Sequence, residues 1–235
     1  MRPELQPIRT QAPYGAQEAS LRQNRVLRNT YWLLAVSLIP TAIGAVIGTN
    51  MNLGFLRASP MISFFVILAV FYGWIFAIEK NRNSSMGIVL LLGFTLFLGL
   101  LLGPLFQRVL GFRNGTELVM LAAGGTAAVF FVMAGIATTT KRDLTSLGSF
   151  LTVGAIVIML AVVANVFFAS PVLHLALLAA FVLFSSMLIL FQLNAIVRGG
   201  ETNYISATLT LYIAIYNLFS SLLQLLGIFG GSNSD

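Results

Sequence analysis

Polar side chains at helical spacing mark the last apolar stretch of the chain, from Ser206 to Phe229. The stretch has no charge over about 24 residues, enough to cross a hydrocarbon core of about 30 Å as a helix. At about 100° per residue its hydroxyls and amides fall on one narrow stripe. Such a stripe could line a path for ions or small solutes, or hydrogen-bond to neighbouring helices. The stripe consists of Ser206, Thr210, Asn217, Ser220, Ser221 and Gln224.

A stripe of polar groups facing lipid would leave its hydrogen-bonding capacity unused. We therefore expect it to face other helices or a water-filled cleft, and we predict that this segment is the central helix of a bundle. Ser185 and Gln192 share one face of the preceding apolar run. If a pathway exists, we expect Asn217 and Gln224 to line it together with Ser185 and Gln192.

The single histidine, His174, lies at the start of the apolar run that contains Ser185 and Gln192. One interpretation is a pH-sensitive group at the outer mouth of a cleft. The other is an interfacial histidine that hydrogen-bonds to a loop carbonyl, which is common where a helix enters a membrane.

Ionisable groups are absent from the middle of every apolar run. Proton relays and ion sites inside membranes use such groups, so their absence argues against a proton-coupled transporter. Each acidic residue is predicted to lie in a loop, in a tail or at a helix end. These residues are Glu4, Glu18, Glu79, Glu117, Asp143, Glu201 and Asp235.

Catalytic signatures are also absent. The sequence contains no HExxH, GxSxG, P-loop or GxGxxG motif. One histidine and no cysteine leave little with which to build a metal site or a thiol nucleophile. We therefore predict no enzymatic activity, no cofactor, no catalytic residue and no bound metal.

The composition is that of an integral membrane protein. Of the 235 residues, 58% are hydrophobic and 9% are charged, against about 25% charged in soluble domains. The formal charge is +6, but the positive residues lie at the predicted membrane edges, so we expect a lipid bilayer and not a nucleic acid as their partner.

Seven apolar runs, each long enough to span a membrane, predict an all-α bundle. We divide the chain into an N-terminal arm (residues 1–30), a seven-helix domain (31–229) and a short tail (230–235). The arm is polar and is expected to become helical near Ala16. The runs are Tyr31 to Thr49, Pro60 to Ile78, Met86 to Phe106, Leu118 to Thr138, Leu147 to Phe168, Leu173 to Val197 and Ser206 to Phe229.

The distribution of Lys and Arg predicts the orientation, since cytoplasmic loops are enriched in both. The other side carries only Arg57, Arg108 and Arg113. We therefore predict a cytoplasmic N-terminus and an external, periplasmic C-terminus in a bacterial inner membrane. The residues on the predicted cytoplasmic side are Arg2, Arg9, Arg22, Arg25, Arg28, Lys80, Arg82, Lys141, Arg142 and Arg198.

Several segments resemble the bacterial YccA branch of the Bax inhibitor family, and the resemblance covers essentially everything after residue 25. The most specific part is the run from Arg198 to Phe219, which contains GGETNYI. The similar segments are VLRNTYWLL (26–34), AAGGTAAVFF (122–131), TTKRDLTSLGSFL (139–151), VVANVFF (162–168) and IVRGGETNYISATLTLYIAIYNLFSSLLQLLGI (196–228).

The resemblance implies a seven-helix bundle with the last helix in the centre, and it implies two functions. The YccA branch is implied to bind the FtsH membrane protease and restrain it. Other members are implied to leak calcium through a pore latched by two aspartates that share a proton. Here Gln192 replaces the first aspartate, and Ala214, two residues after Tyr212, replaces the second. Neither can titrate, so this latch cannot operate in that form.

We therefore expect a regulatory protein that inhibits FtsH, with a calcium leak channel lacking the latch as the alternative. Its candidate docking face is a group of polar residues in the predicted cytoplasmic loops. Simple positive-inside loops would also explain the basic members of this group. The group comprises Arg142, Asp143, Arg198, Glu201, Asn203 and Tyr204.

Overall fold

The computed structural model describes residues 12–51, 59–140 and 144–231, which form seven helices and no strand. Every helix includes a stretch long and apolar enough to cross a membrane, so the chain is a multi-pass membrane protein and the predicted all-α fold class is confirmed. The helices are α1 (Ala12–Asn50), α3 (Pro60–Lys80), α4 (Ser85–Leu110), α5 (Gly115–Thr139), α6 (Thr145–Phe168), α7 (Pro171–Val197) and α8 (Tyr204–Gly230).

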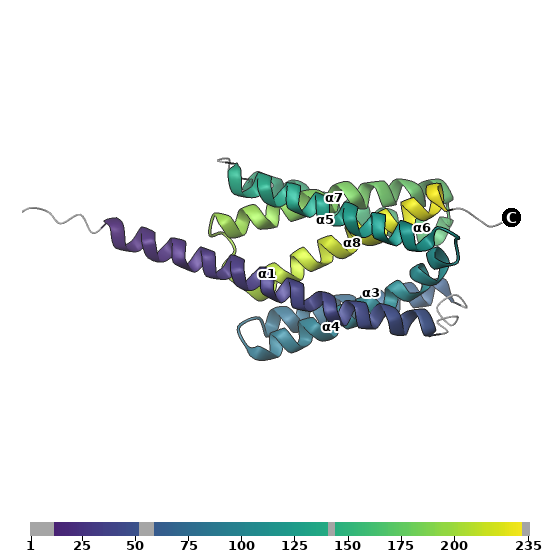
Figure 1. The fold of residues 1–235 in the computed structure, drawn as a ribbon, viewed down its shortest axis with the longest axis horizontal. Coiled ribbons are helices and arrows are strands. Elements are labelled where there is room, and N and C mark those ends of the chain that lie inside the picture. Colours follow the sequence, from purple (N-terminus) through teal and green to yellow (C-terminus); the bar gives the residue numbers. More distant parts are fainter. Residues whose placement is uncertain (1–11, 52–58, 141–143, 232–235) are drawn as a thin grey trace, which may run out of the picture.

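Helix α1 is far longer than its apolar run. It has 39 residues and is therefore about 58 Å long, so it projects beyond the other helices at one end of the bundle (Figure 1). The sequence predicts an N-terminal arm that becomes helical near Ala16. In the structure the helix begins at Ala12 and continues unbroken into the span. The division of the chain at residue 30 stays a prediction, and it coincides with no break in secondary structure.

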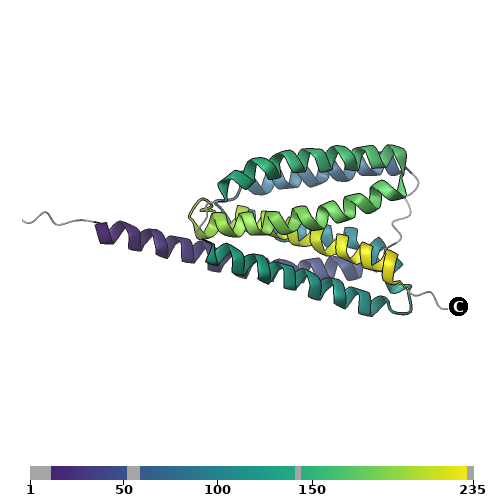
Figure 2. The ribbon, with the colours of Figure 1, turned by 90° about the horizontal axis from the view of Figure 1, so that it is seen from above.

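Helix α8 is the centre of the bundle, as its polar stripe predicts. It packs against α1, α3, α4, α5 and α7, and in Figures 1 and 2 it runs diagonally between them. Its apolar side chains form the core with those of α4 and α7. The side chains of Leu211, Ala214, Leu218 and Leu223 are completely buried.

Glycines allow the backbones of α1 and α4 to come into direct contact. Gly44 and Gly48 of α1 lie against Gly99 and Gly103 of α4. A Cβ atom at Gly99 would collide with the backbone carbonyl of Thr41, and one at Gly103 with the backbone of Gly48. Small residues at four-residue spacing are a common means of close helix packing in membranes, so this contact fixes the position of α1 against the core.

Helices α3 and α6 lie at the periphery. They lie side by side in Figure 2, and each has few buried residues in its most apolar stretch. Helix α6 packs mainly on α7, and α3 packs mainly on α4. The outer part of α8 therefore faces α3, α6 and α7.

Candidate functional site

The middle of α8 is closed. Ala214 is 0% exposed and belongs to the same apolar cluster as Ile189, Leu193 and Leu218. Gln192 of α7 is 6% exposed, and Ser185 lies about two turns earlier on the same helix with its hydroxyl buried. The Ser185 hydroxyl has no hydrogen-bond partner among the described residues. This layer of buried side chains closes the middle of the bundle in this structure.

Tyr212 ties the central helix to two neighbours. Its hydroxyl lies 2.6 Å from Oγ1 of Thr41 on α1 and 3.3 Å from the carbonyl oxygen of Thr95 on α4. Because Tyr212 donates its single proton to the Thr95 carbonyl, the Thr41 hydroxyl can donate to the Tyr212 oxygen, and the Ser37 carbonyl at 2.8 Å is its alternative acceptor. The ring of Tyr212 stacks on that of Tyr216, with centroids 6.4 Å apart. The tyrosine is therefore part of the seal between α1, α4 and α8.

Two pockets flank α8 beyond this seal, near the end where α6 stops and α7 begins. The first has a volume of about 280 Å³ and the second about 250 Å³, and both are lined by Ser220 and Gln224. The first lies between α4 and α8, and its other lining residues are Leu101, Leu102, Pro104, Leu105, Arg108 and Tyr216. The second also reaches α3, α6 and α7, and its other lining residues are Phe64, Val162, Asn165, Val166, His174, Leu177, Leu178, Phe181, Asn217 and Ser221.

The candidate cleft residues therefore divide into two groups. Asn217 and Gln224 line the second pocket, and Gln224 lines both. The two pockets do not include Gln192, Ala214 or Tyr212, which lie in the closed layer together with Ser185. His174 lies in the first turn of α7 and contributes to the second pocket, half-buried. The stripe on α8 thus hydrogen-bonds to α3 through Ser206 and Glu79 at its inner end, and it lines the two pockets at its outer end.

Sequence reasoning did not single out three residues that the structure places at these sites. Thr41 and Thr95 surround the Tyr212 hydroxyl, and Asn165 lines the second pocket from α6. A polar residue within an apolar run is the signal that could have found them. That signal does not say which helices meet.

The loop between α7 and α8 is tied to the rest of the predicted cytoplasmic end. The Asn203 side chain donates to the Arg82 carbonyl at 3.0 Å and to Asn83 Oδ1 at 2.8 Å. Arg198 donates to the carbonyl oxygen of Thr140 at 3.2 Å. Glu201 accepts from the Asn203 backbone at 2.8 Å. These contacts join the α7–α8 loop to the α3–α4 loop and to the end of α5.

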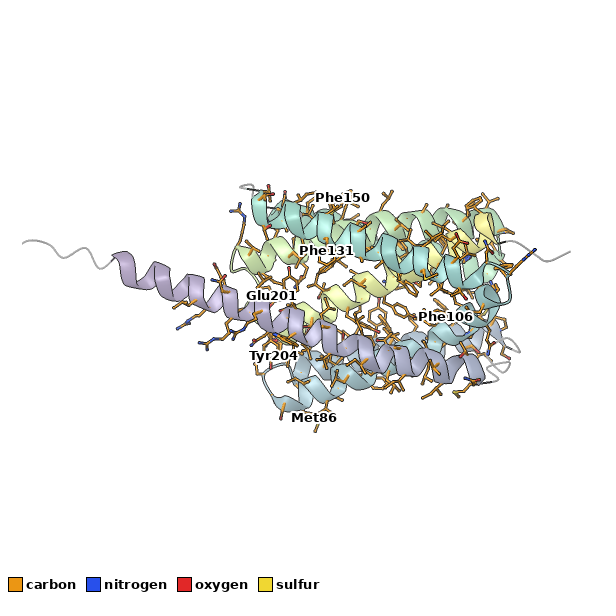
Figure 3. The ribbon with its side chains drawn as sticks, in the orientation of Figure 1. Met86, Phe106, Phe131, Phe150, Glu201 and Tyr204 are labelled. Carbon is orange, nitrogen blue, oxygen red and sulfur yellow. The ribbon has the colours of Figure 1, made fainter. Side chains whose placement is uncertain are left out.

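Four of the six residues of the candidate docking face lie in the described part of the chain, in or next to the α7–α8 loop. Glu201 and Tyr204 lie beside α1 in Figure 3, at the end from which α1 projects. The side chain of Gln23 on α1 covers Gly199, a residue whose positive φ of 77° favours glycine. The structure brings Arg198, Glu201 and Asn203 into one loop cluster with the ends of α3 and α5. Arg142 and Asp143 lie outside the described residues.

Replacing Asn203 by Ala is expected to lower the free energy of unfolding by about 1–2 kcal/mol. Its Oδ1 accepts from the backbone N–H groups of Ile205 and Ser206, which caps α8, and a lost cap costs about 1 kcal/mol. Asn203→Ser keeps a capping acceptor and loses the donors to the α3–α4 loop without placing a second oxygen against the Arg82 carbonyl, so it should lose less stability. Thermal unfolding in detergent measures both. Equal losses in the two variants would contradict the capping role.

Comparison with known proteins identifies the family. The family model described as "Inhibitor of apoptosis-promoting Bax1" matches residues 23–231, which include all of α3 to α8 and most of α1. The chain belongs to the Bax inhibitor family. Its resemblance to this family, which rests on GGETNYI and the neighbouring segments, is thus confirmed. In this family member, uncharged residues occupy positions 192 and 214.

Several family members are similar over most of their length. A protein of Neisseria meningitidis serogroup A is 48% identical over 209 residues, which cover 88% of this chain and 92% of the relative. The Escherichia coli K12 protein named "Modulator of FtsH protease YccA" is 42% identical over 207 residues, which cover 88% and 91%. The protein of E. coli O6:H1 named "Inner membrane protein YccA" shows the same identity and coverage.

Proposed function

We propose that the protein is a non-enzymatic regulator of the FtsH membrane protease in the bacterial inner membrane, which it binds and restrains. The single observation that carries this proposal is the unbroken helix α1, which extends from the core of a closed bundle past the ends of the other helices (Figure 1). The E. coli relative named as a modulator of FtsH supports the choice of partner.

The geometry of α1 suits a contact outside the membrane. Gln23 touches the α7–α8 loop, and Val26 and Leu27 still pack against the core. The helix continues from there to Ala12, about 16 Å further at 1.5 Å per residue. A membrane-anchored protease beside the bundle would meet this segment first on the cytoplasmic side, where the charge distribution places it.

The base of the projecting segment is basic. Arg22, Arg25 and Arg28 are exposed on α1 and follow one another at three-residue spacing. Guanidinium groups at the rim of an interface attract acidic surfaces and raise association rates more than they add buried energy. These arginines would orient the protease against the arm and the loop cluster that contains Arg198 and Glu201.

The test is co-purification of FtsH with the chain and its effect on the turnover of a membrane client. Replacing Arg22, Arg25 and Arg28 together by Gln should weaken association about tenfold, or about 1.4 kcal/mol, since exposed pairs contribute about 0.2–1 kcal/mol each. The triple Lys variant keeps the charge and should retain most of the association. Arg108→Gln, near the other end of the bundle, is the matched control and should change nothing.

Two further checks make the test decisive. Deleting residues 1–20 should relieve the restraint on client turnover while the bundle remains intact. A protease-accessible N-terminal tag should show the same orientation in every variant, because removing positive charge can invert a membrane protein. If FtsH neither co-purifies with the full chain nor changes client turnover when the chain is overproduced, the proposal is wrong.

The alternative function is a calcium or ion leak. The polar wall that α8 contributes to both pockets favours it. The closed layer around Ala214 and Tyr212 weighs against a leak. The lining of the two pockets also weighs against it, because calcium prefers anionic oxygen ligands and none of the described lining residues has a carboxylate. Liposomes with the purified protein should take up calcium no faster than empty liposomes at neutral and acid pH, and faster uptake would favour the leak.

A further inference from the structure

The first pocket is a groove between one face of α4 and one face of α8. Its lining residues recur at three- or four-residue spacing on each helix, so they lie above one another along it. The two rows are Leu101, Leu105 and Arg108 on α4, and Tyr216, Ser220 and Gln224 on α8. From Tyr216 to Gln224 the groove extends over about two turns, or about 12 Å.

Arg108 marks the outer end of this groove. It lies in the last turn of α4, is exposed, and makes no ion pair and no hydrogen bond among the described residues. The distribution of Lys and Arg predicts that this end of α4 lies at the outer membrane surface, which is the level of the lipid headgroups. A guanidinium matches the geometry of a phosphate with its parallel N–H donors, so a free arginine at this level favours a phosphate-bearing anion.

Two neutral donors in the groove are left for a ligand. The Tyr216 hydroxyl makes no hydrogen bond among the described residues, and its oxygen is not completely buried, so a ligand can reach it. The Gln224 amide donates one N–H to the Ser220 carbonyl at 3.2 Å, which leaves its second N–H free to donate. The groove therefore offers a charged donor and a neutral donor at its outer end and a further neutral donor at its inner end.

The spacing of these groups gives the ligand its shape. An anion would bind at the outer end, and the Tyr216 donor lies about two turns deeper, in a groove that Leu101 and Leu105 also line. A glycerophospholipid has the same order, with a charged phosphate, then ester carbonyl oxygens that accept hydrogen bonds, and then apolar chains. The volume of about 280 Å³ equals that of about nine water molecules, which suits the roughly ten non-hydrogen atoms of a glycerol phosphate.

The charge of the lining selects among phospholipids. Arg108 is the only charged side chain among the described residues that line the groove, and none of them is acidic. An anionic headgroup gains this counter-charge, whereas the ammonium group of a zwitterionic headgroup would meet a like charge, which lowers affinity. The groove therefore suits an anionic phospholipid.

We propose that the first pocket binds the headgroup of an anionic glycerophospholipid of the outer leaflet. The Arg108 guanidinium and the second Gln224 N–H bind the phosphate, the Tyr216 hydroxyl donates to an ester carbonyl, and an acyl chain packs against Leu101 and Leu105. Free phosphate carries the same anionic group, but it would fill only the outer end of the groove and would not reach Tyr216. The site lies at the opposite end of the bundle from the arm proposed to meet FtsH, and it does not depend on that function.

The experiment uses the delipidated full chain in detergent, with native mass spectrometry to count bound probe molecules. Phosphatidylglycerol represents the lipid source and inorganic phosphate the aqueous source. Phosphatidylcholine with the same acyl chains is the zwitterionic comparison. We expect one phosphatidylglycerol to bind about fivefold more tightly than phosphatidylcholine, the upper end of what an exposed charge pair contributes. Inorganic phosphate should not displace it.

Variants of the lining test the site itself. Arg108→Gln should abolish the preference for phosphatidylglycerol, while Arg108→Lys keeps the charge and should retain part of the preference. Tyr216→Phe should weaken binding of phosphatidylglycerol about threefold, and it should leave the melting temperature unchanged because the hydroxyl has no partner among the described residues. Arg113→Gln removes the same charge from an exposed residue outside the groove, so it is the matched control and should bind as the unaltered chain does.

Three results would overturn the proposal. Phosphatidylglycerol could bind no more tightly than phosphatidylcholine, or the Gln variants of Arg108 and Arg113 could lose the preference equally, which would mean that overall surface charge and not the groove attracts the lipid. Displacement of the lipid by inorganic phosphate, with no effect of Tyr216→Phe, would assign the site to free phosphate. FtsH should still co-purify with Arg108→Gln, so failure here is distinguishable from failure of the proposed function.

Discussion

Gly99→Leu should abolish accumulation of the folded protein. The new Cβ would meet the carbonyl oxygen of Thr41, which is backbone and cannot rotate away. Over-packing a well-filled core costs about 1–3 kcal/mol, and a backbone collision exceeds this range because α1 and α4 would have to separate along their glycine contact. The yield of monodisperse protein after detergent extraction, and its melting temperature, measure the effect.

Gly124→Leu on α5 is the matched control. A Cβ at Gly124 meets no atom within 4 Å, so the same change of residue adds volume where there is space. We expect a yield and a melting temperature close to those of the unaltered chain. Equal yields of the Gly99 and Gly124 variants would show that α1 and α4 do not depend on close backbone approach.

Tyr212→Ala should lower the free energy of unfolding by about 3–5 kcal/mol, as truncation of large buried aromatic side chains does. The side chain is 2% exposed and fills the space where α1, α4 and α8 meet. Its loss removes the stacking on Tyr216 and leaves a cavity in the sealing layer. Reversible unfolding in detergent gives the loss of stability, and ion uptake into liposomes reports whether the layer still seals.

Tyr212→Phe separates packing from hydrogen bonding. It keeps the ring and removes only the hydroxyl that contacts Thr41 and Thr95. Thr41 keeps its bond to the Ser37 carbonyl, so we expect a loss of about 1 kcal/mol. A loss in the Phe variant as large as that in the Ala variant would mean that the hydrogen bonds, and not the ring, hold the three helices together.

The sequence predicts the spans well, because crossing a bilayer requires a long apolar run whatever the neighbouring helices are. Six of the seven helices extend the predicted runs by about a turn or less. Helix α1 differs because its first half is polar, and apolar periodicity cannot detect a helix that stands in water. Pro13 is compatible with this early start because the backbone N–H groups of the first helical turn have no partner within the helix, so the N–H that proline lacks is not needed there.

The candidate site could be predicted only as a stripe. Ser206, Asn217 and Gln224 share one face of α8, and the sequence correctly indicates that this face is turned inward. It cannot indicate which helix covers each part, because that depends on the packing of distant segments such as α1 on α4. The same face therefore contacts Glu79 at one end, through Ser206 Oγ at 3.0 Å, and borders Asn165 near the other.

The continuous helix α1 has a mechanical consequence. From Ala12 to Asn50 it is one rod, and its far half is clamped by glycines against α4 and by Thr41 against Tyr212. Between Ala16 and Ile39 the helix contains neither Gly nor Pro, and Pro40 lies beside the clamp, so tilt at the N-terminal end is transmitted as far as the clamp, about 40 Å away. A partner that held the N-terminal end of α1 would therefore act on the tilt of this helix against α4.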